Sequence, residues 1–378
     1  MIDVTRLLWR AWRGRHPTGI DRVCLAYVQH FRDRGLAVVQ RKGFIFVLSR
    51  ANSERVFDLL LRGREVRRAE IIRVLGRAIV SARRASPGEN MLYLNVGHTG
   101  LNDRALPRWI ARNHVRAVHL VHDLIPITNP EFCRPGEAEK HRERISNALA
   151  SGTGIIGNSR ETLNELTSFA REKSVSMPPS VVAWIAGLGD SSEIIPKSLK
   201  SPFFVTVGTI EARKNHLMLL RIWRRLVEEL RDTAPVLVIV GQAGWEADEA
   251  LQILKDLGQL ERRVLQMDDC DDDELGAWIA GARAVLMPSL AEGFGLPVVE
   301  ALALGTPVIA SDLPVFREIA SDIPTYLPSN DQMAWEAQIR AFMTDCAERE
   351  RQVERMRAYE APTWSEHFRI VEDWLAEL

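Results

Sequence analysis

Short apolar runs alternate with helical patterns along almost the whole chain, and this alternation restricts the fold more than any other feature. Each run has the length of a buried strand, as in GLAVVQ (35–40), FIFVLS (44–49), NMLYLNVG (90–97), RAVHLVHDL (116–124), GTGIIGNS (152–159), SVVAWIAG (180–187), FFVTVGTI (203–210), VLVIVGQAG (236–244), VLQM (264–267), ARAVLMPS (282–289) and TPVIASD (306–312). Parallel strands are covered on both faces by their connecting helices, so they read as continuous apolar runs. The sequence therefore predicts an α/β chain with parallel sheets.

The alternation is interrupted in the segment GLGDSSEIIPKSLKSP (187–202), which is rich in Gly, Ser and Pro. A chain of 378 residues with 46% hydrophobic residues can bury the cores of two α/β domains. We therefore place a domain linker in this segment. The predicted domains cover residues 1–190 and 201–361, and a C-terminal helix of about 362–378 is expected to pack back on the first domain.

The two halves of the chain carry opposite charge although the net charge is only −1. Residues 1–185 hold 30 Lys and Arg against 17 Asp and Glu, whereas the remainder holds 19 against 33. A basic first half indicates an anionic partner, such as nucleic acid, anionic lipid or a phosphorylated acceptor. An arginine-rich solvated surface without a partner is the alternative interpretation.

Residues 54–84 combine an apolar stripe with many arginines on a helical period, and Gly63 is expected to separate two helices. Such a basic amphipathic segment can lie on a membrane surface. The other interpretation is a pair of core-packing helices with an arginine-rich solvent face. In the membrane interpretation, the inserting and headgroup-binding side chains are Phe57, Leu60, Ile71, Ile72, Leu75 and Ile79 with Arg67, Arg68, Arg83 and Arg84.

The cysteines and the N-terminus indicate the compartment. Cys24, Cys133, Cys270 and Cys346 lie far apart without a CxxC spacing, which favours a reducing environment and no zinc site. The N-terminus lacks the apolar core of a signal peptide, and no apolar run reaches the roughly 18 residues of a spanning helix. We expect a cytoplasmic protein, and in the membrane interpretation of residues 54–84 it is peripheral on the inner face of the membrane.

The segment EGFGLPVVE (292–300) holds two glutamates with seven residues between them. A buried strand precedes it, and a helix from about 297 to 304 follows its glycines. Free backbone N–H groups at a helix start form an anion site, and glycine lets a ligand approach the backbone closely. A ligand with a diphosphate in its middle and hydroxyls at both ends would use all of these groups, and a nucleotide-sugar is such a ligand.

Together with neighbouring motifs, this segment resembles the nucleotide-binding domain of the family 4 retaining glycosyltransferases. The similarity covers FVTVGTIEARKNHLMLL (204–220), VLVIVGQAGW (236–245), the stretch 271–319 and the PTW that ends at Trp364. GTIEARKN resembles mannosyl- and rhamnosyl-type members of bacterial polysaccharide pathways. The resemblance implies the GT-B fold, in which two Rossmann-like domains with parallel sheets face each other across a cleft.

The resemblance also implies roles for residues of the second half. Glu300 would bind the ribose hydroxyls and Glu292 the hydroxyls of the donor sugar, while Arg213 and Lys214 would stabilise the leaving diphosphate. Further donor-binding positions are the turn before the helix and two glycines that would keep the backbone clear of the nucleotide, namely Gly293, Phe294, Gly295, Leu296, Gly208 and Gly241.

In the first half the similarity is weaker. HPTGIDRV (16–23) stands where many relatives have two adjacent glycines, so Gly19, Asp21 and Arg22 are candidates for acceptor binding. His122 ends an apolar strand, and the resemblance implies that a histidine at this position faces the reacting sugar. A satisfied core histidine is the alternative, although ligands bind at the carboxyl ends of parallel strands. His98 is a further candidate for an acceptor contact, and Asn158, Ser159 and Arg160 are candidates for lining the cleft.

The acidic run DDCDDDE (268–274) raises the question of a metal site. Carboxylates at a helix start are favourable without a metal, and we predict a helix N-cap there. We therefore expect no metal and no cofactor besides the nucleotide-sugar co-substrate.

Together with the resemblance, these observations predict a retaining hexosyltransferase that moves a hexose from a nucleotide-sugar to a saccharide or lipid-linked acceptor in surface polysaccharide synthesis, with GDP-mannose as first guess for the donor. A UDP-sugar-dependent enzyme of the same fold and an inactive glycosyltransferase-like binding subunit are the alternatives. An NAD-dependent oxidoreductase would need G-x-G-x-x-G after a first strand, and HPTGID does not match this motif. We expect no nucleic-acid partner.

Overall fold

The computed structural model describes residues 1–14, 18–63, 68–82, 90–188 and 194–378. The chain divides into two compact units. Unit 1 comprises Met1–Ile127, Ala138–Ile185 and Trp364–Leu378, and unit 2 comprises Thr128–Glu137 and Ala186–Thr363. The change of unit after Ile185 lies next to the predicted linker, whose residues 189–193 are outside the described chain. The assignment of residues 128–137 to unit 2 differs from the predicted first domain of 1–190.

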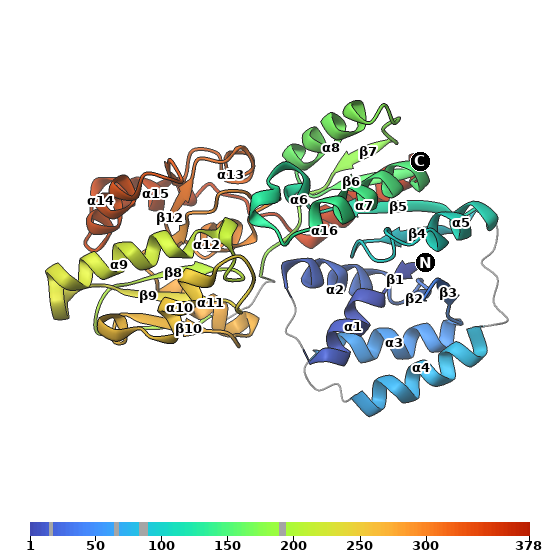
Figure 1. The fold of residues 1–378 in the computed structure, drawn as a ribbon, viewed down its shortest axis with the longest axis horizontal. Helices are drawn as coiled ribbons and strands as arrows, with labels where there is room; N and C mark the ends of the chain where they lie inside the picture. Colours follow the sequence, from blue (N-terminus) through green and yellow to red (C-terminus); the bar gives the residue numbers. More distant parts are fainter. Residues whose placement is uncertain (15–17, 64–67, 83–89, 189–193) are drawn as a thin grey trace. The chain divides into compact units, whose positions relative to one another are not determined.

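Unit 1 contains a seven-stranded sheet with the order β3-β2-β1-β4-β5-β6-β7 (Figure 1). Its strands are β1 (Ile2–Asp3), β2 (Ala37–Arg41), β3 (Phe44–Val47), β4 (Leu92–Asn95), β5 (Arg116–Val121), β6 (Gly154–Gly157) and β7 (Ser180–Val182). The prediction of parallel pairing is wrong for one edge, where β3 runs antiparallel to β2. Lys42 and Gly43 both have positive φ, 47° and 78°, as a two-residue hairpin turn requires.

Helices surround this sheet, and the last one comes from the C-terminus. They are α1 (Thr5–Arg13), α2 (Gly19–Phe31), α3 (Arg50–Leu61), α4 (Arg68–Ala82), α5 (Ala105–Arg112), α6 (Ile125–Thr128), α7 (Glu137–Ser151), α8 (Arg160–Glu172) and α16 (Trp364–Glu377), while the 3₁₀ turn η2 (Pro130–Phe132) belongs to unit 2. On α16 the imidazole of His367 lies 2.9 Å from the Tyr27 hydroxyl, and the rings of Phe368 and Tyr27 meet edge to face. The C-terminal helix thus packs inside unit 1.

The predicted amphipathic segment forms α3 and α4, with Gly63 after the end of α3, as expected. Phe57, Leu60 and Ile71 are buried in the core, which agrees with the core-packing interpretation and not with their insertion into a membrane. Ile72 alone among the large apolar side chains described there is strongly exposed. Arg67, Arg83 and Arg84 and the side chain of Ile79 lie outside the described part of the chain.

Unit 2 contains a six-stranded sheet with the order β10-β9-β8-β11-β12-β13, and all of its pairs are parallel. Its strands are β8 (Phe203–Val207), β9 (Val236–Val240), β10 (Val264–Met267), β11 (Val285–Met287), β12 (Val308–Ser311) and β13 (Thr325–Leu327). Its helices are α9 (His216–Leu230), α10 (Asp248–Lys255), α11 (Asp272–Gly281), α12 (Leu296–Ala303), α13 (Pro314–Ala320), α14 (Gln332–Phe342) and α15 (Ala347–Met356), with the 3₁₀ turns η3 (Ala212–Lys214), η4 (Arg231–Thr233) and η5 (Gly258–Leu260). Trp223, Trp335 and Phe342 are fully buried in its core.

In each sheet the chain order reverses at one point. In unit 2 the chain moves outward from β8 through β9 to β10 and then returns to the other side of β8 with β11. In unit 1 the corresponding neighbours are β1 and β4. Loops that leave the carboxyl ends of such neighbouring strands diverge, so a crevice opens between them, and ligands of α/β sheets bind there.

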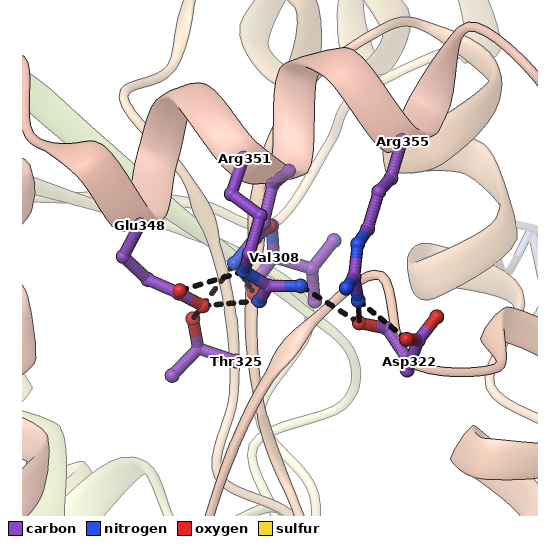
Figure 2. Close-up of polar contacts among 7 residues, drawn as sticks. Val308, Asp322, Thr325, Glu348, Arg351 and Arg355 are labelled. Atoms are coloured by element: carbon purple, nitrogen blue, oxygen red, sulfur yellow. Dashed lines mark hydrogen bonds and ion pairs between the residues drawn. The ribbon is translucent and has the colours of Figure 1, made fainter.

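Helix α15 is fixed to the edge of the second sheet by a buried amide. The Gln352 side chain accepts from the Val308 N–H at 2.8 Å and donates to the Val308 carbonyl at 3.1 Å and to the Thr325 hydroxyl at 2.8 Å. Figure 2 shows the charged neighbours on the same helix, where Glu348 meets Thr325 and Arg355 meets Asp322. Gln352 therefore connects α15 to the backbone of β12 and to a side chain of β13.

Replacing Gln352 with Leu should lower the free energy of unfolding by about 2 kcal/mol or more, because the Val308 N–H and carbonyl lose their partner inside the protein. Urea unfolding followed by circular dichroism measures this change. Gln252→Leu on the exposed side of α10 is the matched control and should leave stability nearly unchanged. Equal stability of Gln352→Leu and wild type would contradict the role of this amide.

Candidate functional site

Two loops of unit 2 meet where the chain order reverses, one after β8 and the other after β11. The Leu290 N–H donates to the Arg213 carbonyl at 2.7 Å, and the Arg213 guanidinium donates to the Ala291 carbonyl at 3.1 Å. Asn215, with φ of 57°, donates from its side chain to the Pro288 carbonyl at 3.3 Å. These bonds hold the loops together, so the predicted site residues of both loops converge.

Glu292 is the centre of a cluster of charges formed by these loops. Its Oε2 accepts from Arg213 Nη1 at 2.9 Å, and its Oε1 accepts from Lys214 Nζ and, at 2.8 Å, from the Ser289 hydroxyl. Arg213 Nη2 also pairs with Glu211 Oε1 at 2.6 Å. The side chains of Glu292 and Lys214 are only 6% and 11% exposed, so the cluster is shielded from bulk water.

Burial and charge act in opposite directions on Glu292. Desolvation raises the pKa of its carboxyl, but Lys214, Arg213 and the Ser289 hydroxyl together lower that pKa to about 2. Desolvation also lowers the pKa of Lys214, and the ion pair with Glu292 opposes this shift. Glu292 is therefore ionised throughout the neutral range and holds the two cations in fixed positions.

The resemblance placed Arg213, Lys214 and Glu292 in one donor site, with the cations on the diphosphate and the carboxylate on the sugar, and these roles stay predictions. In the structure they are partners of one another. Glu211 and Ser289 were missed, although each stands two or three residues from a predicted member and carries a polar group into the same loop. Their short distance in sequence from predicted site residues was the signal that could have identified them.

Gly208 and Gly241 have a packing role that the sequence did not indicate. Gly208 has φ of 144°, and a Cβ there would lie 3.1 Å from Lys214 Cε. A Cβ on Gly241 would collide with the Gly208 carbonyl. The glycines let the loops after β8 and β9 touch backbone to backbone, and they leave room for the Lys214 side chain. Their expected role toward a nucleotide stays a prediction.

The turn before α12 has the predicted form. Gly295 caps the helix with φ of 104°, where a Cβ would meet the Phe316 ring, and the helix runs over Leu296–Ala303 as expected. Phe294 is buried, while Gly293 and Leu296 are partly exposed. Glu300 lies in the second turn and is buried, with its Cγ packed against Gly187, where a Cβ would approach to 2.5 Å.

The acidic run 268–274 forms the predicted helix start. Asp271 is the N-cap of α11 and accepts from the Glu274 N–H at 2.8 Å. Within the described residues, no group of three or more His, Cys, Asp or Glu side chains is arranged to hold a metal ion. The absence of a metal requirement stays a prediction.

In unit 1, Asp21 takes part in a comparable ion-pair group. The guanidinium nitrogens of Arg6 and Arg10 lie 2.6 and 2.7 Å from its two carboxylate oxygens. Asp21 also completes a capping box with Thr18 at the start of α2, whose first residue is Gly19. Asp21 thus has a structural role that its interpretation as an acceptor-binding residue did not include. Arg22 is partly exposed on the same helix. The sequence analysis did not identify Arg6 and Arg10 as members of this group.

The predicted His122 and His98 lie together, and His141 joins them. The ring centroids of His98 and His122 are 5.2 Å apart, and those of His98 and His141 are 5.9 Å apart. His122 Nε2 lies 2.7 Å from the Val96 carbonyl, so this nitrogen carries the proton and donates. Burial lowers the pKa of His122 to about 4, which keeps its imidazole neutral at pH 7.

The candidates in GNSRET have local structural roles. The Asn158 amide donates to the His122 carbonyl at 2.9 Å, and Ser159 caps α8, which begins at Arg160. Asn158 therefore positions the backbone beside His122.

Comparison with known proteins identifies the second half of the chain. Residues 190–359 match the sequence family described as glycosyl transferases group 1. This segment is a group 1 glycosyltransferase domain. It contains every member of the Glu292 cluster and Glu300.

Relatives of this glycosyltransferase domain include bacterial mannosyltransferases. The chain is 28% identical over 226 residues to the serotype-specific mannosyltransferase WbdA of Escherichia coli, a match that covers 56% of this chain and 28% of that protein. It is 29% identical over 252 residues to the O-antigen chain mannosyltransferase B of Escherichia coli, covering 62% of this chain and 63% of that protein. The chain thus spans less than two thirds of the length of these relatives.

The solved structures show the same architecture. Anabaena HepE, crystallised in complex with UDP, superimposes with a TM-score of 0.68 at 15% identity, covering 100% of this chain and 99% of that chain. Two Rossmann-like units, whose sheets are parallel except for the edge strand β3, and this similarity confirm the predicted GT-B fold class. The expected cleft between the sheets stays a prediction. None of the helices in the described ranges is long and apolar enough to cross a membrane.

Replacing Glu292 with Gln should destabilise the glycosyltransferase domain by about 3 kcal/mol at pH 7, because two buried cations lose their main counter-charge. The Glu292 pKa of about 2 lies below its ordinary value of 4.5, so this contribution is complete above about pH 4.5 and is lost as the pH falls toward 2. Urea unfolding at several pH values measures it.

The difference in stability between wild type and Glu292→Gln should stay constant from pH 8 to pH 5 and shrink below that range. Glu261→Gln, an exposed carboxylate of unit 2, is the control and should show little difference at any pH. A difference that grows as the pH falls would contradict the ion-pair assignment.

Proposed function

We propose that this chain is a retaining glycosyltransferase that moves a hexose from a nucleotide-sugar to a saccharide or lipid-linked acceptor in surface polysaccharide synthesis. The observation that carries the proposal is the convergence of Arg213, Lys214 and Glu292 at the point where the strand order of a group 1 glycosyltransferase domain reverses. The relatives named mannosyltransferases support mannose as the hexose and GDP-mannose as the donor. The fold similarity to a UDP-bound protein keeps a UDP-sugar as the second candidate.

The two cations suit a diphosphate leaving group. When the bond between the sugar C1 and the diphosphate oxygen breaks, the electron pair stays on the diphosphate, and Arg213 and Lys214 stabilise its growing charge. The acceptor oxygen forms the new bond to C1 on the same face, and its proton passes to the leaving diphosphate. The reaction then needs no nucleophilic side chain and no metal, and the protein contributes position and charge.

The carboxylates orient the donor in this proposal. Glu292 is already bound by Arg213, Lys214 and Ser289, so its position is fixed before the donor arrives. It would accept a hydrogen bond from a hydroxyl of the donor sugar. Glu300, one turn into α12, would accept from the ribose hydroxyls, while the N–H groups of Gly293 and Gly295 would face the diphosphate.

His122 would serve as a neutral hydrogen-bonding group. Its Nε2–H is occupied by the Val96 carbonyl, which leaves Nδ1 as an acceptor for a sugar hydroxyl. A pKa near 4 excludes a charged imidazolium at neutral pH, so His122 would position the sugar without acting as a general acid. His98, Gly19, Asp21 and Arg22 remain acceptor candidates of unit 1.

A donor screen tests the proposed function. Release of nucleoside diphosphate is measured with GDP- and UDP-sugars, with and without EDTA, in the presence of a saccharide acceptor. We expect release with GDP-mannose to exceed that with UDP-sugars and EDTA to leave it largely unchanged. Faster release with a UDP-sugar would favour the second donor class. Donor binding without release under every condition would favour an inactive binding subunit.

Lys214→Ala should lower kcat by about 100-fold and change KM little, because the charge that Lys214 meets grows in the transition state. Steady-state kinetics with the donor found in the screen measure both constants. Lys214→Arg keeps a cation and should retain more activity than Lys214→Ala, whereas Lys255→Ala on α10 should behave like wild type. A change confined to KM would show that Lys214 only helps to bind the donor.

A further inference from the structure

An apolar groove lies on unit 1 between α1, β2 and α4, far along the chain from the glycosyltransferase domain. Its volume is about 480 Å³. Most of its lining is aliphatic or aromatic, from Leu8, Trp9, Trp12, Val39, Ile71, Ile72 and Leu75. Figure 1 shows α1, α3 and α4 grouped on one side of β1 to β3. The groove is therefore built from elements of one unit alone.

The groove is open, and part of its lining consists of exposed apolar side chains. Leu8 and Ile71 are buried and form part of the lining, whereas Trp9 is 50% and Ile72 59% exposed. An exposed large apolar residue is ordinary when it stands alone, but adjoining ones around a groove indicate a binding surface.

Arginines stand beside both tryptophans. The Arg13 guanidinium lies 5.7 Å from the Trp9 ring centroid, and the Arg68 guanidinium lies 5.9 Å from the Trp12 ring centroid. Arg68 also donates to the Trp12 carbonyl at 2.9 Å. These four residues line a second hollow. Each indole thus carries a cation next to an apolar surface, which is the arrangement of interfacial membrane anchors.

Among the residues that the structure describes, two acidic groups near this surface, Asp21 and Glu70, are each paired with arginine. Helix α1 contains no Asp or Glu, and Asp21 at its side is paired with Arg6 and Arg10. Glu70 in the first turn of α4 pairs with Arg62 at 3.1 Å. The charge that Arg13 and Arg68 present outward is therefore positive.

We propose that this surface, the α1–α4 groove with Trp9, Trp12, Ile72, Arg13 and Arg68, binds the anionic face of a lipid bilayer. The end of one acyl chain would enter the groove, the indoles would lie at headgroup depth, and the two guanidiniums would meet lipid phosphates. The inference goes beyond the proposed transferase reaction and rests on unit 1 alone, so it can succeed or fail independently of that reaction.

Charge selects the bilayer over the other occupants of an apolar groove. In a two-fold dimer formed through this face, the Arg13 and Arg68 of one copy would approach those of the other, and like charges brought together cost free energy. An uncharged apolar peptide would leave both guanidiniums without a counter-charge. An anionic lipid supplies an apolar chain and a phosphate in one molecule.

Sedimentation with vesicles tests the proposal on the full chain. Vesicles of phosphatidylcholine with phosphatidylglycerol should sediment the wild type at low salt, while high salt or pure phosphatidylcholine should release it. The variant Arg13→Glu with Arg68→Glu should weaken binding at least about 25-fold, because each lost basic residue contributes roughly fivefold near such a surface. Arg108→Glu with Arg112→Glu on exposed positions of α5 changes the charge of unit 1 equally and should retain most of the binding.

A second pair of variants tests the apolar contribution. Ile72→Glu should reduce vesicle binding, whereas Met333→Glu, at a position in unit 2 that is 63% exposed, should not. Circular dichroism and melting temperature confirm that each variant is folded. Brominated lipids should quench wild-type tryptophan fluorescence, and Trp9→Phe with Trp12→Phe should abolish most of that quenching.

The proposal is overturned if the wild type fails to sediment, or if the α1–α4 variants and their controls lose binding to the same extent. It is also overturned if quenching by brominated lipid survives in the double tryptophan variant. Self-association of the wild type that Ile72→Glu abolishes, without vesicle binding, would assign the groove to a second copy of the chain instead.

Discussion

The ion pairs of Glu292 are the interaction on which the candidate site depends. A carboxylate and two cations buried together lose much hydration, and only short contacts between them offset that loss. Here Arg213, Lys214 and the Ser289 hydroxyl all contact one carboxylate, and Glu211 binds Arg213 from the other side. Because the partners come from the loops after β8 and β11, the same contacts that neutralise the charges also fix the geometry of both loops.

Unit 1 also contains a buried carboxylate that is paired with two cations. Asp21 is buried and is held by Arg6 and Arg10, just as Glu292 is held by Arg213 and Lys214. Arg6 follows β1 and packs against Gly97, which follows β4, so this ion-pair group also stands where the strand order reverses. In both sheets the loops diverge at this point. Ion pairs fix the positions of the polar side chains there.

The two units therefore divide the chemistry of the proposed reaction between them. The glycosyltransferase domain holds fixed cations and carboxylates that suit a nucleotide diphosphate and its sugars. Unit 1 holds neutral histidines near β4 and β5 and a basic apolar surface on α1 and α4. Under the two proposals, the first set would bind the nucleotide-sugar donor, and the second would bind a saccharide acceptor and an anionic membrane.

Local patterns in the sequence determined much of this protein: most strands of both sheets, the helix that follows Gly295 and the N-cap at Asp271. Each depends on residues a few positions apart, whose periodicity or capping chemistry is visible directly. Only the tertiary structure decided which groups pair, as when Glu292 binds Arg213 from 79 positions away, and which faces are buried. It also decided that β3 turns antiparallel, that residues 128–137 join unit 2, and that Trp9 and Ile72 are exposed where Phe57 and Leu60 are not. A helical period of apolar residues shows that one face of a helix is apolar. It does not show what covers that face, since this depends on elements distant in the chain.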